Sequence, residues 1–543
     1  MASTQVTSNF KQFKRMQNEA TYLKKKRTHQ PPRKTRLRGY VTLILLTLAA
    51  FCPMFLSDVI WSPYDTVERS AYTSLENWQE AWHPENLRRY DPISTTTYFI
   101  EQALPLPLAP LHYGINLVLH LTAAILLLRL LQRLKLHGAW ITSLVFALHP
   151  ATLQTLFWSG YRSEFVGLIA ILMALHFGTR TLNSSHYIKL LLITIAACII
   201  HPGAFAIPFI LMLYTYWQKP KFELRHINYV LPILCICLFV ALWKAGAVTN
   251  SSSIISLDSF KITSQNLYFY LKQAFIPIDG WLFYTVDPAT IYSSSTAIYL
   301  LPLLLFAPIF FLSFSNRRKS WARGTLLGAL GYLLLLIPGL INHGAFIDGS
   351  LAYEDHGQYI ALPALVALVF CGAATITRHF AAGARKTCFT GLTVLIALEF
   401  MTTVSFAAYA LSQPVQMWQQ FSKQWPNSSL AKIAYFETLR ADAPDSLSNK
   451  ELIQHLEVIL EMDSNNLKMR TLYARTLRER REYSNAYREY RRILQEAEPN
   501  VDFLKEAVEF YEQIGKQWEA NKLRDQIDSL PQHEQTKFQN STN

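Results

Sequence analysis

The feature that most constrains the fold is a series of long apolar runs separated by short polar loops. A helix needs about 20 apolar residues to cross a bilayer, and the sequence contains about eleven runs close to that length. The predicted spans are residues 39–57, 112–133, 139–157, 163–178, 187–201, 203–217, 228–246, 295–314, 323–341, 358–377 and 387–411. Runs of this length favour helices, which satisfy their own backbone hydrogen bonds in lipid. The sequence therefore predicts an all-α, polytopic membrane bundle.

Lysine and arginine concentrate in alternate loops between these runs, and this asymmetry predicts which side each loop occupies. Loops on the cytoplasmic side of a membrane carry an excess of both residues. If the N-terminus is cytoplasmic, the predicted spans place every basic cluster on that side: residues 129–135, 180–189, 219–225, 317–323 and 378–386. The outer side then carries four segments: residues 58–111, 247–294, 342–357 and 412–543.

The N-terminal segment 1–38 is strongly basic and contributes much of the net charge of +13. A basic arm can bind nucleic acid, but directly before an apolar span it is typical of cytoplasmic retention and contact with anionic lipid. We therefore expect membrane lipid, and no nucleic acid, as a partner. The six cysteines lie inside or beside apolar runs, and their spacing predicts neither a disulfide framework nor a metal site.

Residues 264–286 form a further apolar stretch that is difficult to assign as a span. Counting it as a span would move the basic cluster 317–323 to the outer side. We therefore predict a re-entrant or interfacial element that bends at Pro277. Irregular backbone at membrane depth requires burial in protein or a cavity.

After residue 411 the composition changes to charged helix formers, which predicts a helical domain over 412–531 and a disordered tail over 532–543. Apolar and small residues recur at a period of about 34, which is typical of tetratricopeptide repeats. Ala474, Ala486 and Ala520 are the small positions at which paired helices can approach closely. A plain pair of helical hairpins is the alternative. A stack of such repeats is expected to bind a protein partner or acceptor through its concave face.

Several local motifs recur in the order and spacing of a known family. They are Tyr90-Asp91-Pro92-Ile93-Ser94, Leu111-His112-Tyr113 with Asn116 and His120, Ala147-Leu148-His149-Pro150 with Trp158, Gly160 and Arg162, and Asp355-His356 with Tyr359. On these residues the chain resembles the transmembrane and tetratricopeptide-repeat O-mannosyltransferases, membrane glycosyltransferases of the C superfamily. The resemblance implies a helical bundle over residues 39–411, with catalytic loops and repeats on the outer side.

The resemblance also implies a reaction, the transfer of a sugar from a polyprenyl-phosphate carrier to an acceptor hydroxyl. A carboxylate suits the deprotonation of the acceptor, and arginine suits the leaving phosphate through its permanent charge and fork geometry. We expect Asp65, or else Asp58, to be the base, because both lie on the first outer loop. The residues expected to bind the donor or orient the acceptor are Arg88, Arg89, Tyr90, His112, His149, Arg162, His201, Asp355, His356 and Tyr359.

Some of these residues also have a structural explanation. Arg88 and Arg89 could anchor to lipid phosphates, and His149 before Pro150 could simply end a helix. Asn116 and His120 are about one turn apart inside a span, which favours a structural hydrogen-bonded pair. Carboxylates with a histidine can bind a divalent metal, and Glu354, Asp355 and His356 form such a cluster, but no spaced partner motif indicates a metal.

Departures from the family pattern leave two functions open. Ser62-Pro63 occupies the place of the family's acidic pair, Asp91 replaces an arginine, and Gln154 replaces a glutamate. The retained aromatic and histidine-rich outer loops favour a glycosyltransferase that needs no certain cofactor beyond its lipid-linked donor. The lost charges favour a non-catalytic scaffold whose repeats dock a partner in surface-polymer or pilus assembly. The expected location is a bacterial inner membrane, with the repeats in the periplasm.

Overall fold

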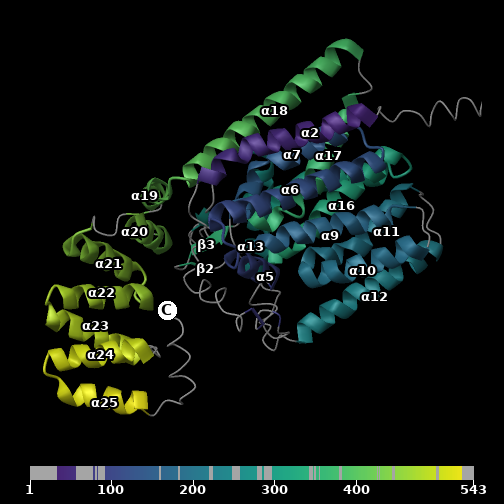
Figure 1. Cartoon of the computed structure of the whole chain (residues 1–543). Helices are drawn as coiled ribbons and strands as arrows, with labels where there is room; N and C mark the ends of the chain where they lie inside the picture. The colour runs from purple at the N-terminus through teal and green to yellow at the C-terminus, as the bar shows by residue number, and fades with distance from the viewer. Residues whose placement is uncertain are drawn as a thin grey trace, which may run out of the picture.

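The computed structural model shows a bundle of apolar helices beside a stack of shorter, more polar helices (Figure 1). Nearly all described residues are helical, as the all-α prediction requires, and one small antiparallel sheet is added. The described residues are 33–56, 78–79, 82, 92–157, 161–180, 184–218, 224–246, 257–277, 284–286, 296–341, 346–347, 350–353, 355–377, 382–424, 426, 428–442, 447–496 and 501–528.

The helices of the bundle coincide with the apolar runs, and 3-10 turns (labelled η) interrupt them. Their bounds are α2 (Arg33–Phe51), η1 (Cys52–Leu56), α5 (Pro92–Gln102), α6 (Leu108–Arg133), α7 (Ala139–Leu148), η3 (Pro150–Thr152), α8 (Leu153–Phe157), α9 (Arg162–Gly178), α10 (Ser184–Ile200), η5 (Pro202–Ala206), α11 (Ile207–Gln218), α12 (Leu224–Gly246), α13 (Leu257–Phe275), α15 (Thr296–Ser315), α16 (Ser320–Ile341), η6 (Asp355–Gln358), α17 (Leu362–Ile376) and α18 (Ala382–Leu411).

Four of the described helices are long and apolar enough to cross a membrane. They are Leu37–Leu56, Leu108–Arg133, Ser320–Leu340 and Thr390–Ala410. The number rises to five if Pro150–Phe157 and Arg162–Gly178, which meet at 119°, form one broken span. This number is smaller than the predicted number of about eleven spans. Prolines explain part of the difference, because Pro150 and Pro202 each begin a 3-10 turn and shorten the helices beside it. The larger count stays a prediction.

The two ends of the bundle carry different side chains. At one end, named here the basic end, Arg133 donates to the Thr179 carbonyl oxygen at 3.2 Å, and Arg323 donates to that of Trp217 at 3.2 Å. The opposite end, named the histidine end, carries His149, His201 and His356 at or beside the 3-10 turns that interrupt the helices. Basic loops far apart in the sequence thus meet at one end of the bundle.

The segment around Pro277 does not form one continuous helix. Helix α13 ends at Phe275, two residues before the proline, and strand β1 (Tyr284–Val286) follows. Strand β1 pairs antiparallel with β3 (Ser350–Tyr353), and β2 (Phe346–Ile347) pairs with the other edge of β3. The sheet therefore joins two segments that the loop charges predict to lie on the same side of the membrane.

Shorter helices follow α18, and alternate helices from α21 to α25 begin at a fixed spacing. The shorter helices are α19 (Pro414–Gln424), α20 (Ser429–Asp442), α21 (Asn449–Met462), α22 (Leu467–Glu479), α23 (Tyr483–Glu496), α24 (Val501–Gln513) and α25 (Gln517–Asp528). Helices α22 and α24 begin 34 residues apart. The same spacing separates Arg481 from Gly515, which both adopt positive φ in the turn of a hairpin. The predicted small positions Ala474, Ala486 and Ala520 are all fully buried, so these helices form helical repeats.

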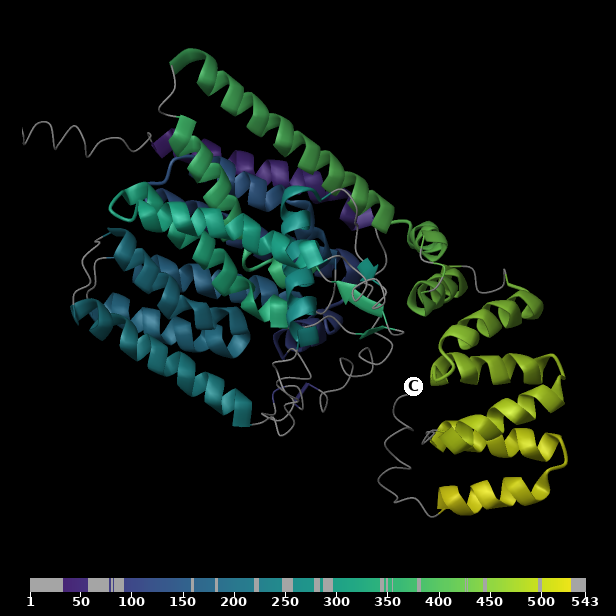
Figure 2. The ribbon, with the colours of Figure 1, turned by 180° about the vertical axis from the view of Figure 1, so that it is seen from behind.

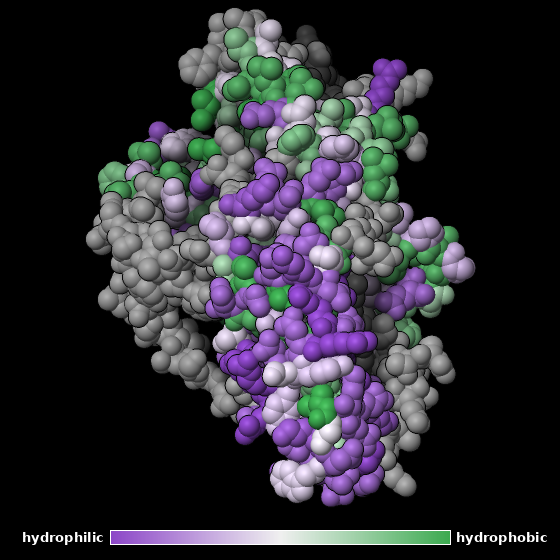
Figure 3. All heavy atoms as spheres, turned by 90° about the vertical axis from the view of Figure 1, so that its left-hand side faces the viewer, coloured by the Kyte–Doolittle hydropathy of each residue, from purple (hydrophilic) through white to green (hydrophobic). Residues whose placement is uncertain are grey.

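The repeats and the bundle have separate hydrophobic cores. The bundle core continues into α19 and α20 through Trp418 and Ala434. Helices α22 to α25 enclose a core of their own that includes Tyr490 and Phe510. The exposed face of the repeats is mainly hydrophilic (Figure 3). Seen from behind, α18 lies along α2 and leads into the repeats (Figure 2).

Candidate functional site

The structure brings many of the predicted site residues together at the histidine end. His112 and Arg162 lie in the first turns of α6 and α9, while the others flank the 3-10 turns at this end: His149, His201, Asp355, His356 and Tyr359. The remaining predicted residues lie outside the described part of the chain: Asp58, Asp65, Arg88, Arg89 and Tyr90.

Four buried side chains form a closed ring between α5, α6 and α9. Arg162 Nε donates to Asn116 Oδ1 at 2.9 Å, and its Nη1 donates to Glu101 Oε1. His112 Nδ1 lies 2.8 Å from Glu101 Oε2, and Asn116 Nδ2 lies 3.2 Å from His112 Nε2. None of the four side chains is more than 1% exposed.

The hydrogen bonds of this ring determine where its protons lie. Asn116 accepts from Arg162 through Oδ1 and donates through Nδ2 to the Leu156 carbonyl oxygen at 3.0 Å, which fixes the orientation of its amide. An amide nitrogen can only donate, so His112 Nε2 accepts and the imidazole proton lies on Nδ1, directed at Glu101. Arg162 Nη2 lies 2.9 Å from His112 Nδ1. With the imidazole proton on Nδ1, both nitrogens are donors, so no hydrogen bond joins them.

Glu101 is the anionic member of the ring. Burial alone would raise the pKa of its carboxyl, but the hydrogen bond from His112 and the charge of Arg162 more than offset burial and lower the pKa below its ordinary value. The ring therefore pairs one negative and one positive charge away from water, the condition under which buried charges are tolerated. Any role of Arg162 in binding a phosphate would require the ring to open.

The ring also fixes the C-terminal part of the first predicted outer segment onto the bundle. The backbone N–H of Arg162 donates to Ser94 Oγ on α5 at 3.1 Å. The indole N–H groups of Trp78 and Trp82 both donate to Thr96 Oγ1, at 2.9 and 2.7 Å. Trp78 and Trp82 thus contact α5, and α5 attaches to α9.

His149 and His201 occupy the same local structure. Each precedes a proline and caps a 3-10 turn by accepting a backbone N–H two residues later, from Ala151 at 3.2 Å and from Gly203 at 2.9 Å. Nδ1 is the accepting atom in both histidines, so the proton lies on Nε2. His149 thus follows the last residue of α7, and His201 follows the last residue of α10.

The Nε2 atoms of these two histidines have different partners. His149 Nε2 donates to the Ala274 carbonyl oxygen at 3.1 Å, which attaches the end of α13 to the end of α7. His201 Nε2 donates to Glu164 Oε1 at 3.0 Å, and both of these side chains are 11% exposed. Glu164 and His201 are therefore the acid–histidine pair of this site that lies nearer to solvent than the Glu101 ring.

Asn116 and His120 do not form the pair that their spacing suggests. Asn116 belongs to the buried ring, whereas His120 Nδ1 lies 2.8 Å from the Tyr359 hydroxyl and its Nε2 lies 3.1 Å from the Ala147 carbonyl oxygen. Tyr359 is fully buried. Both residues have structural partners, as expected for polar groups within a span, but each finds its partner on another element.

His356 lies over Tyr161 with ring centroids 3.7 Å apart and an interplanar angle of 15°. Its backbone N–H donates to Gln154 Oε1 at 3.0 Å. Gln154 stands where the family carries a glutamate, and here its side chain attaches α8 to η6. Among the described residues, no three His, Cys, Asp or Glu side chains gather as metal ligands. Glu354 lies outside those residues.

Sequence reasoning missed the two acids that pair with the predicted basic residues. Glu101 lies at the end of α5, within the first predicted outer segment, and Glu164 lies in the first turn of α9. Glu164 follows Arg162 by two residues, and this pair of charged residues before an apolar run indicates a polar helix start. Glu101 is 61 residues from Arg162, and only the packing of α5 on α9 brings the two together.

Backbone contact between α16 and η6 leaves no room for a side chain at Gly339. A Cβ atom there would overlap the Gly357 carbonyl group, and the Tyr270 hydroxyl donates to the Gly339 carbonyl oxygen at 3.3 Å. We expect Gly339→Ala to lower the free energy of unfolding by about 1–3 kcal/mol or more, because two backbones must separate. Thermal unfolding in detergent measures this loss. Gly391→Ala is the control, since a Cβ atom at Gly391 meets nothing within 4 Å; equal melting temperatures for the two variants would contradict the close approach.

The candidate site is thus a buried polar layer at the histidine end, formed by the starts of α6 and α9 and by three 3-10 turns. Its charged side chains pair with one another, and those of Glu101 and Arg162 join α5 to α9. Neither a protein-family model nor a curated protein matches this chain.

Proposed function

We propose that the chain is a membrane glycosyltransferase that moves a sugar from a polyprenyl-phosphate carrier to a protein or glycan acceptor on the outer face of a bacterial inner membrane. About eleven spans, some of them broken, would form its bundle, and tetratricopeptide-like repeats in the periplasm would bring in the acceptor. The observation that carries the proposal is the buried ring of Glu101, His112, Asn116 and Arg162. It attaches the first outer segment firmly to the bundle.

The chemistry would take place on that attached segment. Asp65, or else Asp58, would deprotonate the acceptor hydroxyl, and the leaving phosphate would bind Arg88 and Arg89 with help from Tyr90. Catalytic groups must keep a fixed geometry, and groups on a loop need a rigid support to do so. The contacts of Trp78 and Trp82 with α5, and of α5 with α9, provide such a support after Asp65 in the chain and on both sides of Arg88, Arg89 and Tyr90.

A non-catalytic membrane scaffold is the second candidate, and one observation favours it. Arg162, His112 and His201, three residues expected at the substrate, all bond to protein neighbours, and two of them are nearly closed to solvent. In this function the bundle would anchor the repeats, which would dock a partner in surface-polymer or pilus assembly. The buried ring would then be purely structural.

Turnover by aspartate variants tests the proposal. We expect Asp65→Asn to lower the rate of sugar transfer about 10²–10⁴-fold, because an amide cannot act as a general base. Asp58→Asn takes its place if Asp58 is the base. The measurement is sugar release from a panel of polyprenyl-phosphate sugars by the purified protein.

Asp91→Asn is the matched control, since it removes an acid of the same segment at a position where the family carries a basic residue. Its rate is expected to equal that of the unchanged protein. The enzyme proposal is wrong if no donor is consumed and all three variants restore the wild-type phenotype to a deletion strain. The scaffold function then remains.

A further inference from the structure

A second feature of the bundle is an apolar cavity. It has a volume of about 900 Å³ and is lined by α6, α9, α11, α16 and α17. Its deep end reaches Leu335, Ile360 and Pro363, and its wall is formed mainly by leucine and isoleucine side chains. The few polar groups of the lining lie mostly in loops and last turns at the basic end, and they include His137, Thr179, Tyr214 and Ser320. The cavity therefore runs from an apolar interior toward the basic end.

Glycines form part of the wall and contribute to the size of the cavity. Gly331 on α16 and Gly372 on α17 both line it, and a Cβ atom at either position would meet nothing within 4 Å. Protein interiors are otherwise packed about as densely as organic crystals. A space of this size and apolar character is suited to a flexible hydrocarbon chain, which gains dispersion contacts along its whole length.

Arginines hold residues of the lining at the polar end of the cavity, although none of them lines it. Arg133 donates to Thr179, which lines the cavity, and Arg323 donates to the carbonyl oxygen of Trp217, which also lines it. Arg180 directly follows Thr179 and lies 2.8 Å from His176. In the described part of the chain, the bonds of these three arginines go to carbonyl, hydroxyl or imidazole groups and never to a carboxylate.

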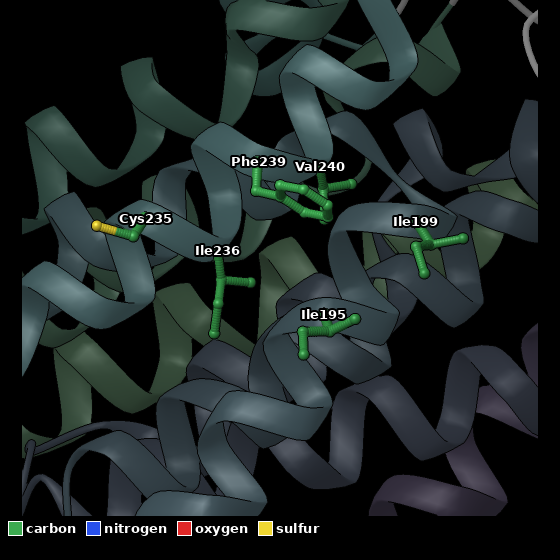
Figure 4. Close-up of a pocket in the computed structure, with 6 residues that line it drawn as sticks. All are labelled: Ile195, Ile199, Cys235, Ile236, Phe239 and Val240. Carbon is green, nitrogen blue, oxygen red and sulfur yellow. The ribbon is translucent and has the colours of Figure 1, made fainter.

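A second apolar groove serves as a comparison for the cavity. Between α10 and α12, the side chains of Ile195, Ile199, Phe239 and Val240 line a space of about 510 Å³ (Figure 4). Cys235 provides its only heteroatom, and no charged side chain lines it. Such a groove fits any lipid chain of the surrounding bilayer and selects none. The larger cavity differs because Arg133 and Arg323 hydrogen-bond to residues of its lining at the polar end.

We propose that the larger cavity binds a phosphate-bearing lipid, with a hydrocarbon chain between α16 and α17 and the phosphate at Arg133 and Arg180. The positive charge of the guanidinium groups attracts an anionic headgroup, and their planar geometry matches phosphate oxygens. The site opens at the end opposite the Glu101 ring, so it does not depend on the proposed transfer reaction. It would hold a structural or regulatory lipid.

Photolabelling of the full chain in phosphatidylcholine nanodiscs tests this proposal. The probe is phosphatidic acid with a diazirine in one acyl chain, and the comparison is diacylglycerol with the same chain, which lacks only the phosphate. We expect phosphatidic acid to label the lining of α16 and α17 about tenfold more than diacylglycerol, the effect of one or two charge-assisted hydrogen bonds. Arg133→Gln with Arg180→Gln is expected to remove this difference without adding volume.

Leucine at the cavity glycines tests the chain part of the site. In Gly331→Leu and Gly372→Leu, labelling of the lining is expected to fall to background, because the new side chain occupies the space of the lipid chain. Gly391→Leu adds the same side chain on α18, outside the cavity, and is expected to leave labelling unchanged. Folding of each variant is checked by its elution as a single species.

Four results would overturn the proposal. The first two are equal labelling by phosphatidic acid and diacylglycerol, and unchanged labelling in both leucine variants. The third is labelling confined to the outward face of α18. The fourth is complete competition by inorganic phosphate, which would indicate a free anion as the ligand. Because none of these measurements depends on sugar transfer, their outcome is independent of the proposed function.

Discussion

Replacing Arg162 with methionine is expected to lower the free energy of unfolding by about 3–5 kcal/mol, the usual cost of leaving one member of a buried ion pair alone. Arg162 and Glu101 are each 1% exposed. Without the guanidinium, the Glu101 carboxylate keeps the hydrogen bond from His112 but loses its positively charged partner, and Asn116 Oδ1 loses its donor. Thermal unfolding in detergent, followed by tryptophan fluorescence, measures the loss.

Two further variants separate charge from volume. Glu101→Met combined with Arg162→Met removes both charges, and we expect it to recover most of the lost stability, because apolar replacement of a whole buried pair is often neutral. Arg475→Met breaks an ion pair with Glu506 on the repeats in which Arg475 is 50% exposed. This control is expected to cost about 1 kcal/mol or less. If Arg162→Met melts like the Arg475 control, the ring does not stabilise the bundle.

Replacing Phe510 with alanine is expected to unfold the repeats and leave the bundle folded. Phe510 is fully buried, and its ring lies 4.6 Å from that of Tyr490 between centroids. Loss of a buried phenylalanine costs about 3–5 kcal/mol, since both the transfer energy and the dispersion contacts of the cavity wall are lost. A small stack of helices has only limited stability to lose. The core around Phe510 is separate from that of the bundle, so the loss should remain local.

Hydrogen exchange of the purified protein measures this effect segment by segment. Amides of α22 to α25 are expected to exchange much faster in Phe510→Ala, while those of α6, α9 and α16 keep their rates. Trp518→Ala is the matched control, because Trp518 is an aromatic residue of the same repeats with 72% of its surface exposed. Its cost is expected to be within about 0.5 kcal/mol. Faster exchange throughout the bundle would show that the two cores unfold together.

The sequence by itself determined which segments are helical and where several of them end. Apolar runs and the repeat period are local patterns, and each becomes a helix or a helical hairpin because burial of one face depends on spacing along the chain. The small positions Ala474, Ala486 and Ala520 could be identified for this reason, and all are buried. The break near Pro277 was also local, since a proline cannot continue a helix hydrogen-bond pattern.

Only the tertiary structure decided which polar groups meet. Glu101 finds Arg162 across 61 residues, and His120 finds Tyr359 across 239. Hydropathy places such residues within or beside a span but contains nothing about the neighbour they face. The cavity is likewise a product of packing, because Gly331 and Gly372 form one wall only when α16 lies against α17. Periodicity along one helix cannot show what two helices leave between them, and for that reason the site and the proposed lipid position both required the fold.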